Sequence, residues 1–244
     1  MFKKGLIYFQ VIFSLFFFIS CQKENDFGDR DYKTLGTAAH ELLSADIYTS
    51  LIVQISYMPG YAPNATTINN LSAFLNTYLN KPVGIQIILQ QIPASSKTSL
   101  NLQEIVQLER NSRSVFTGGN IIAVHFLITD GYYSTASTFA TSYWNTSSCI
   151  FGKTIHDNSN GAGQVSSTQL MSVILEHEFG HLLGLVDQGS PMQATHKDVI
   201  NKGAHCDNSN CLMYYGVETN ASGMMGFPKL DANCIADLRA NGGK

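Results

Sequence analysis

The chain has 244 residues, of which 44% are hydrophobic, 11% aromatic and 14% charged. This apolar content suffices for one packed core and excludes an intrinsically disordered chain. The 15 Lys and Arg against 18 Asp and Glu give a formal net charge of −3. No run of like charge is long enough to follow a phosphate backbone or to coat a membrane surface, so nucleic acid is not expected as a partner.

The N-terminus resembles a bacterial lipoprotein signal. Two lysines precede an apolar run over residues 6–19, which is too short to span a bilayer comfortably. Ser20 then precedes Cys21. The resemblance implies a signal peptide over residues 1–20 and a lipid on Cys21, so that the exported protein would sit at the outer membrane or cell surface. If the signal is instead cleaved plainly, the protein would be periplasmic or secreted.

Polar residues follow the signal at once. Residues 21–36 predict a solvated, flexible tether, and residues 37–244 predict a single domain. No internal repeat or low-complexity tract interrupts that domain. We expect a monomer whose only contact with a membrane is the lipid anchor on Cys21.

The body of the chain alternates between strand and helix patterns. Apolar runs predict buried strands over 51–57, 83–92 and 121–128, and helical spacing predicts helices over 68–79 and 102–108. Shorter, turn-flanked runs at 132–143 and 149–155 are candidates for further strands. This order predicts an α/β (α+β) fold, in which helices cover a mixed, twisted sheet.

One long helix is predicted between residues 166 and 184. Hydroxyl residues at 166–168 offer N-cap oxygens, apolar residues recur at helical spacing from Leu170 to Leu183, and Gly184 can end the helix.

This helix carries two histidines and a glutamate. His177 and His181 are four residues apart, so they lie on one helix face and can present two imidazoles to one ion. Zinc is the natural occupant, because two nitrogens and a third protein ligand leave a fourth position for water, whose pKa the ion lowers. Glu178 is placed to accept the proton of that water and pass it to a leaving nitrogen. The pattern therefore predicts hydrolysis of peptide bonds.

The segment His177-Glu-Phe-Gly-His181-Leu-Leu-Gly184 resembles the HExxHxxG core of metzincin metallopeptidases. In that clan the glycine turns the chain towards a third ligand, and a later methionine turn, here matched by Met213, underlies the site. The nearest likeness is to archaemetzincins, because His205 is followed by a cysteine, a second cysteine and Met213. Over residues 166–215 the resemblance implies a zincin/metzincin-like fold with an active-site helix, one catalytic Zn²⁺ and a protein or peptide substrate.

The third zinc ligand is open between two residues. In metzincins it lies three residues after the glycine, where this chain has Asp187, whereas His205 comes 18 residues later. Either an inserted loop over about 186–204 lets His205 complete a three-histidine site, or Asp187 binds through oxygen, and zinc accepts both. We favour His205, since a nitrogen ligand just before the methionine turn explains two features at once. His196 is a weaker candidate and is interpreted as a loop residue.

Four cysteines remain besides Cys21, namely Cys149, Cys206, Cys211 and Cys234. An even number in an exported protein is compatible with two disulfides, whose pairing the sequence leaves open. Archaemetzincins have a later cysteine pair that completes a separate structural zinc site, but this chain has only Cys234 in that region, which argues against that site. The alternative hypothesis is a small disulfide loop between Cys206 and Cys211.

These observations predict a zinc endopeptidase with His177, His181 and His205 on the metal and Glu178 as the general base. An edge strand within 132–143 would bind the substrate by strand addition. An amidase that acts on cell-wall peptides is the nearest alternative enzyme. The alternative outside the enzymes is a non-catalytic surface lipoprotein that keeps the fold as a binding module. Glu178 argues against it, because binding zinc alone requires no base.

Overall fold

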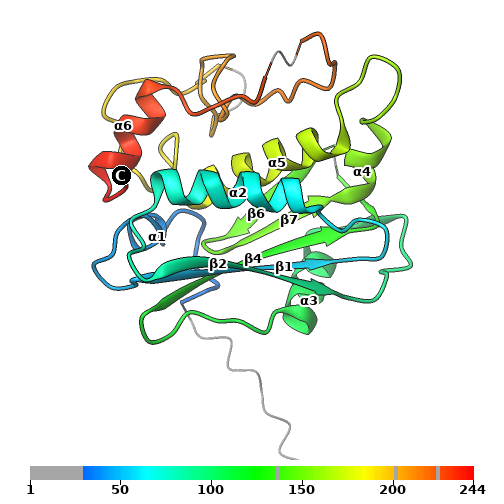
Figure 1. The fold of residues 1–244 in the computed structure, drawn as a ribbon, viewed down its shortest axis with the longest axis horizontal. Helices are drawn as coiled ribbons and strands as arrows, with labels where there is room; N and C mark the ends of the chain where they lie inside the picture. Colours follow the sequence, from blue (N-terminus) through cyan, green and yellow to red (C-terminus); the bar gives the residue numbers. More distant parts are fainter. Residues whose placement is uncertain (1–29, 136–137, 201–202, 224–225) are drawn as a thin grey trace, which may run out of the picture.

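The computed structural model describes residues 30–135, 138–200, 203–223 and 226–244 (Figure 1). The predicted signal peptide, Cys21 and the first part of the predicted tether lie outside these residues. Within the described ranges, no helix combines the length and the apolar character needed to cross a membrane.

A five-stranded sheet forms the centre of the domain. Its order is β2 (Gly84–Gln91), β1 (Ser50–Tyr57), β4 (Ile121–Thr129), β7 (Ser147–Phe151) and β6 (Ala140–Trp144). The pairs of β1 with β2, β1 with β4 and β4 with β7 are parallel, and β6 runs antiparallel to β7. The predicted mixed sheet is confirmed, and β6 forms one of its edges.

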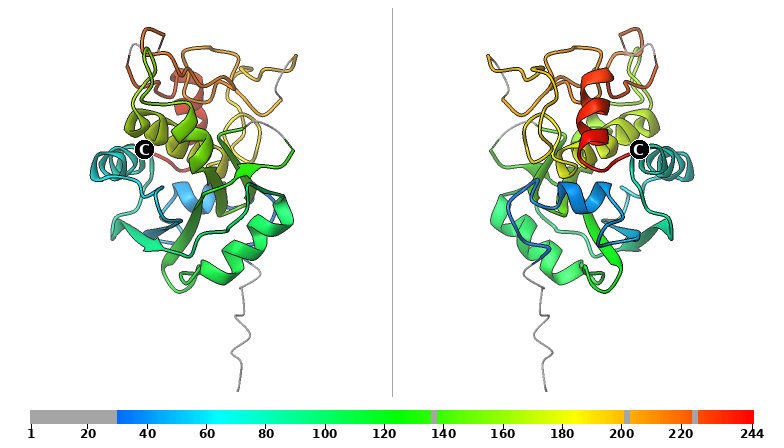
Figure 2. Two further views of the ribbon diagram at one scale, coloured as in Figure 1. Left: turned by 90° about the vertical axis from the view of Figure 1, so that its right-hand side faces the viewer. Right: turned by 90° about the vertical axis from the view of Figure 1, so that its left-hand side faces the viewer.

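Helices cover both faces of this sheet (Figures 1 and 2). Helices α2 (Ala65–Tyr78) and α5 (Ser167–Leu182) lie on one face, and α3 (Leu102–Ser112) lies on the other. The remaining elements are short: α1 (Ala39–Leu43), β3 (Ser99–Leu100), β5 (Tyr132–Tyr133), α4 (Gly152–Asp157) and α6 (Ala232–Ala240). The predicted helices at 68–79, 102–108 and 166–183 are therefore present.

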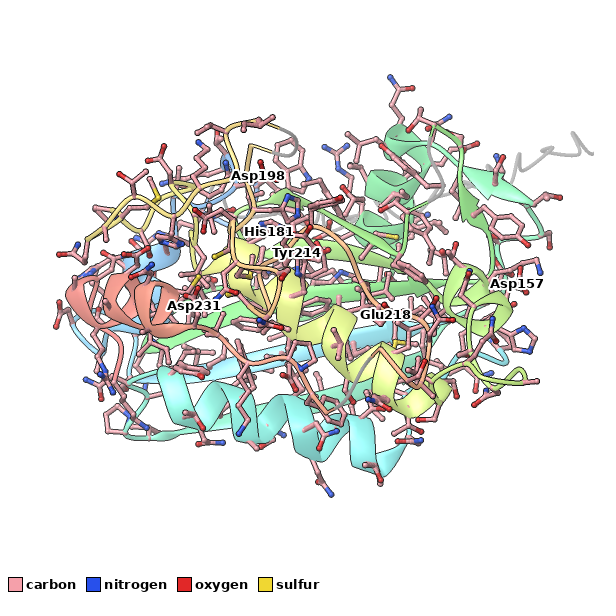
Figure 3. All side chains as sticks on the ribbon, turned by 90° about the horizontal axis from the view of Figure 1, so that it is seen from above. Asp157, His181, Asp198, Tyr214, Glu218 and Asp231 are labelled. Carbon is pink, nitrogen blue, oxygen red and sulfur yellow. The ribbon has the colours of Figure 1, made fainter. Side chains whose placement is uncertain are left out.

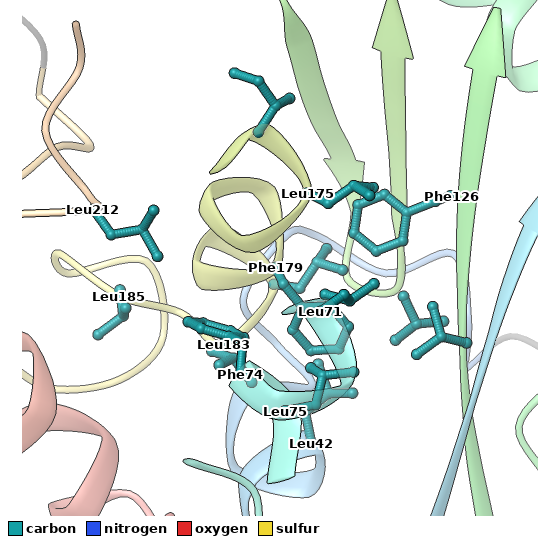
Figure 4. Packing of buried hydrophobic residues seen from close by; sticks show 14 of the residues in the cluster. Leu42, Leu71, Phe74, Leu75, Phe126, Leu175, Phe179, Leu183, Leu185 and Leu212 are labelled. Carbon is teal, nitrogen blue, oxygen red and sulfur yellow. The ribbon is translucent and has the colours of Figure 1, made fainter. Parts of the chain in front are cut away.

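The core between the sheet and α5 fixes the position of that helix. The ring of Phe126 on β4 stacks on that of Phe179 on α5, with centroids 6.0 Å apart. Leu71 and Leu75 of α2 are fully buried in the same cluster (Figure 4). Burying side chains of this size contributes about 1.5–3 kcal/mol each. The helix that carries the predicted metal ligands is thus held by packing along its length.

Three predicted strands differ from what the sequence indicated. Strand β2 is an edge of the sheet rather than a buried strand, with Leu89 46% exposed, because it has a neighbouring strand on one side only. The candidate at 132–143 splits into β5 and β6. The candidate at 149–155 ends at Phe151, where helix α4 begins.

The segment before α1 packs on the domain. Asp31 is 1% exposed, and its carboxylate accepts hydrogen bonds from the backbone N–H and the hydroxyl of Thr117. The guanidinium of Arg113 lies 3.4 Å from the same carboxylate. These contacts place residues 30–36, which the sequence assigned to the tether, within the folded unit.

Candidate active site and metal centre

Local interactions fix where helix α5 begins and ends, and its last turns carry the candidate site. The hydroxyl of Ser166 accepts a hydrogen bond from the backbone N–H of Gln169 and caps the N-terminus. After the helix, Gly184 takes φ +72°, and a Cβ there would lie 2.6 Å from the backbone nitrogen of Ser190. Only glycine fits this reversal without strain.

His177 and His181 face one another from successive turns of α5. Their Nε2 atoms lie 3.1 Å apart. The Nδ1 of His177 lies 2.7 Å from the carbonyl oxygen of Leu212, so Nδ1 carries the proton and donates it, and Nε2 keeps a free lone pair. The structure brings the two predicted nitrogens together.

His205 completes the group from a distant loop. One ligand atom from each of His177, His181 and His205 lies within 4.8 Å of the others. The loop is held by backbone hydrogen bonds from the N–H of Asp198 to the carbonyl of His205, at 2.8 Å, and from the N–H of Cys206 to the carbonyl of Met213, at 2.8 Å. The inserted segment thus folds back and pairs with the chain around the third histidine.

Asp187 does not join the three histidines. Val186 and Asp187 both have positive φ, at 55° and 65°, and this left-handed pair turns the chain outward just after Gly184. The side chain of Asp187 is 59% exposed and lies 3.2 Å from the ammonium group of Lys197. Of the two alternatives left open by the sequence, His205 is therefore the one placed beside His177 and His181.

The donor set suits a zinc ion. Burial lowers the pKa of His177 to about 4 and lowers the pKa of His181 well below its usual value, so both imidazoles are neutral and can act as ligands. Zinc–nitrogen bonds of about 2.0–2.1 Å in a tetrahedron separate two ligand nitrogens by roughly 3.3 Å. The 3.1 Å between the two Nε2 atoms is close to that separation.

Glu178 lies beside the histidines and is buried. One carboxylate oxygen, Oε2, accepts a hydrogen bond of 2.7 Å from the hydroxyl of Ser142 on β6. Burial raises the pKa of Glu178 to about 7, while the hydrogen bond from Ser142 acts in the opposite direction. A carboxylate with this pKa can both accept and return a proton near neutral pH.

A cavity of about 470 Å³ opens onto these side chains. Apart from the three histidines and Glu178, its walls are made of uncharged residues: Leu35, Thr138, Phe139, Ala140, Thr141, Ser142, Ile174, Gln188, Ala204, Tyr215 and Val217. Figure 3 shows the site from above, with His181 near the end of α5 and the C-terminal loops lying over the helix.

Met213 packs directly beneath α5. A Cβ added to Gly180 would lie 2.3 Å from the Sδ of Met213, so the methionine occupies space that only glycine leaves free. Met213 is fully buried, and its backbone carbonyl pairs with Cys206 next to the third histidine. The residue predicted to form the methionine turn thus lies under the site.

A second group of ligand-type side chains adjoins the first. One ligand atom from each of His196, Cys206, Asp231 and Cys234 lies within 4.8 Å of the others, and the Sγ of Cys211 lies 3.6 Å from that of Cys234. Cys149, Cys206, Cys211 and Cys234 are all free thiols. The predicted disulfide between Cys206 and Cys211 is therefore not formed, because Cys211 turns towards Cys234 on α6.

His196, which the sequence suggested as a weak candidate for the third ligand or a loop residue, belongs instead to this second group. It is 1% exposed, its Nε2 lies 2.8 Å from a carboxylate oxygen of Asp237, and its Nδ1 lies 3.4 Å from the Sγ of Cys206. Asp237 lies 41 positions later in the chain, so no local pattern could have revealed the pair.

The mixed α/β fold of this domain is similar to that of a solved archaemetzincin. Archaemetzincin from Methanopyrus kandleri superposes with a TM-score of 0.54 at 13% identity, covering 79% of this chain and 96% of that one. Metalloproteinase-II from Bacteroides fragilis gives a TM-score of 0.44 at 17% identity, covering 89% of this chain and 58% of that one. No protein-family model matches the chain, and neither does any curated protein. At these identities the likeness to archaemetzincin shows the fold.

Proposed function

We propose that the protein is a zinc-dependent endopeptidase. The observation that carries this proposal is the convergence of His177, His181 and His205 beside the buried carboxylate of Glu178, at the floor of a cavity. Three imidazole ligands leave one zinc position open, which is the arrangement of catalytic rather than structural sites.

Each side chain of the site has a separate role in the proposed hydrolysis. A zinc ion held by the three imidazoles would supply Lewis acidity towards a substrate carbonyl and lower the pKa of water. Glu178 accepts the proton of the attacking water and delivers it to the leaving nitrogen. The hydrogen bond from the N–H of His177 to the carbonyl of Leu212 keeps the imidazole in the tautomer whose Nε2 faces the site.

An extended peptide is the substrate that the cleft favours. Strand β6 is an edge of the sheet, and an edge strand can pair with an added peptide strand. Residues 139–142, at the start of this edge, also line the cavity. Because the edge can accept peptide on both sides of the site, we propose cleavage within chains.

The second group of ligands supports a second ion with a structural role. We assign His196, Cys206, Cys211 and Cys234 to it, because three thiolates and an imidazole are one of the common ligand sets of structural zinc sites. Asp231 is already engaged, since its Oδ1 accepts from the backbone N–H of Cys234 and its Oδ2 from the amide of Asn208. Metal analysis of the purified protein should give two zinc ions per chain, whereas a single ion would contradict this assignment.

Replacing Glu178 with Gln tests the proposed function. The variant should retain zinc and lose cleavage of a denatured protein substrate, because the ligands remain and the base is gone. Glu176→Gln is the matched control: burial also raises the pKa of Glu176 to about 7, but this side chain lines a different cavity, so activity should persist. A wild type that binds zinc yet cleaves no peptide in a broad library would favour the binding module, and cleavage only of cell-wall peptides would favour the amidase.

The export prediction is also proposed and has a direct test. If Cys21 carries lipid, the protein should partition into detergent, and Cys21→Ser should abolish that behaviour. Equal partitioning of both forms into water would contradict the anchor.

A further inference from the structure

Two serines on neighbouring strands face the predicted base. Ser142 on β6 lies directly opposite Ser148 on β7, and directly opposite residues of an antiparallel pair point to the same face of the sheet. Ser148 is in turn opposite Phe126 of β4, whose ring stacks on α5. The two hydroxyls therefore face α5 and not α3.

The distances define a chain of hydrogen bonds. The Oγ of Ser142 lies 2.7 Å from the Oε2 of Glu178 and 2.7 Å from the Oγ of Ser148. A carboxylate can only accept, so Ser142 donates its single proton to Glu178. Ser148 must then donate to Ser142. Ser148 is fully buried, and water does not compete for this bond.

A β-bulge maintains this alignment. Ser142 pairs with Ser148, but Trp144 pairs with Ser147, so β6 contains one extra residue, Tyr143. The hydroxyl of Tyr143 donates to Glu109 at 2.6 Å on the opposite face of the sheet. Bulges of this kind aim single side chains next to functional sites.

We propose that Ser142, backed by Ser148, is a positioning residue for Glu178. It holds one carboxylate oxygen towards the sheet, so that the other oxygen is left free to meet the attacking water. This inference rests on the proposed peptidase function, since a base needs orientation only if it transfers a proton. A mere packing role would be satisfied by any small side chain at position 142.

The chain offers a matched control on the neighbouring strand and the other face of the sheet. The hydroxyl of Ser147 on β7 donates to the buried carboxylate of Glu109 at 2.6 Å, a bond of the same type as that from Ser142 to Glu178. Ser147→Ala removes this bond far from the cavity. It should reduce thermal stability and leave turnover per zinc-loaded molecule unchanged.

The kinetic test compares the zinc-loaded wild type and the Ser147→Ala control with three variants at positions 142 and 148, all on one peptide substrate. Ser142→Ala should lower kcat by about tenfold with KM and zinc content unchanged, because the loss of one hydrogen bond to a charged group is worth roughly that factor. Ser142→Thr, which keeps the hydroxyl, should restore most of the rate, and Ser148→Ala should cause a smaller loss. A Ser142→Ala variant with wild-type kcat and full zinc content would overturn the proposal.

Crystal structures of the wild type and of Ser142→Ala give a readout that does not depend on activity. The carboxylate of Glu178 should leave its position or occupy several rotamers when the hydroxyl is absent. A carboxylate that stays in place in Ser142→Ala would overturn the positioning role even if the wild type cleaves nothing. If the wild type cleaves nothing but the carboxylate of Glu178 does move in Ser142→Ala, the peptidase function is refuted and the positioning role is not.

Discussion

The two clusters of ligand-type residues meet at one peptide bond but differ in chemistry. The first cluster ends at His205, consists of nitrogen donors and opens onto a cavity beside Glu178. The second includes Cys206, the next residue, is rich in sulfur, and its histidine and cysteines are buried. An open nitrogen site suits catalysis and a closed sulfur site suits structure. If both clusters hold zinc as proposed, one loop serves both roles, because the second cluster would anchor the chain that supplies His205 to the first.

Removing His205 should have the largest effect. His205→Ala leaves two imidazoles, so the catalytic zinc and all peptidase activity should be lost while the second cluster keeps its ion. Asp187→Ala should leave both ions bound, because this carboxylate is exposed and paired with Lys197. Zinc content by mass spectrometry and activity on a denatured substrate distinguish the two variants. Loss of zinc only from the Asp187 variant would refute the assignment.

Removing His196 should affect stability before it affects chemistry. His196→Ala deletes a proposed ligand of the second cluster and leaves the buried carboxylate of Asp237 with only the backbone N–H of Gln193 as a donor, a loss of about 1.5–3 kcal/mol for one hydrogen bond to a charged group. Denaturant titration measures the change. His156→Ala, at a histidine whose side chain is 74% exposed, is the control and should be neutral. Equal stability of both variants would show that the second cluster anchors nothing.

The charge on Glu178 should make the metal-free protein less stable as the pH rises. Burial raises its pKa from 4.5 to about 7 in the folded state, so folding binds a proton, and the stabilisation present below pH 4.5 is lost as the pH passes 7. The metal-free Glu178→Gln variant does not lose this stability, because its side chain has no proton to release. The free energy of unfolding should therefore shift in favour of the variant by about 2–3 kcal/mol between pH 5 and pH 8. If the difference in free energy of unfolding between the two forms did not change with pH, the carboxyl group of Glu178 would be solvated and the prediction would be wrong.

Filling the space above Met213 should have the smallest effect. Gly180→Ala forces a methyl group into the position taken by Sδ, and overpacking of this kind costs about 1–3 kcal/mol. The propensity of alanine for helices offsets roughly 1 kcal/mol of this. Thermal denaturation of the metal-loaded protein measures the balance, and a more stable variant would mean that Met213 can move aside freely.

The parts of the molecule that the sequence predicted are those with a repeating pattern. The apolar run of β4 and the helical stripe of α5 each specify one element, and the spacing of His177 and His181 follows from the helix itself. Strand β2 was misjudged because an apolar run by itself does not distinguish an edge strand from a central one. The position of His205 depends on how an inserted segment folds back, and that of His196 on Asp237 far along the chain. The residues around His205 and Met213 pointed to His205 as a ligand, but the contacts that place it and His196 form only on folding, so no local pattern encodes those contacts.

Anomalous diffraction at the zinc absorption edge, on crystals of the wild type grown with zinc, tests the central claim most directly. Besides a peak at the thiol cluster, we predict a peak between the Nε2 atoms of His177 and His181 and a nitrogen of His205, within about 2.0–2.1 Å of each. Density at the thiol cluster alone, with the three imidazoles turned apart, would contradict it.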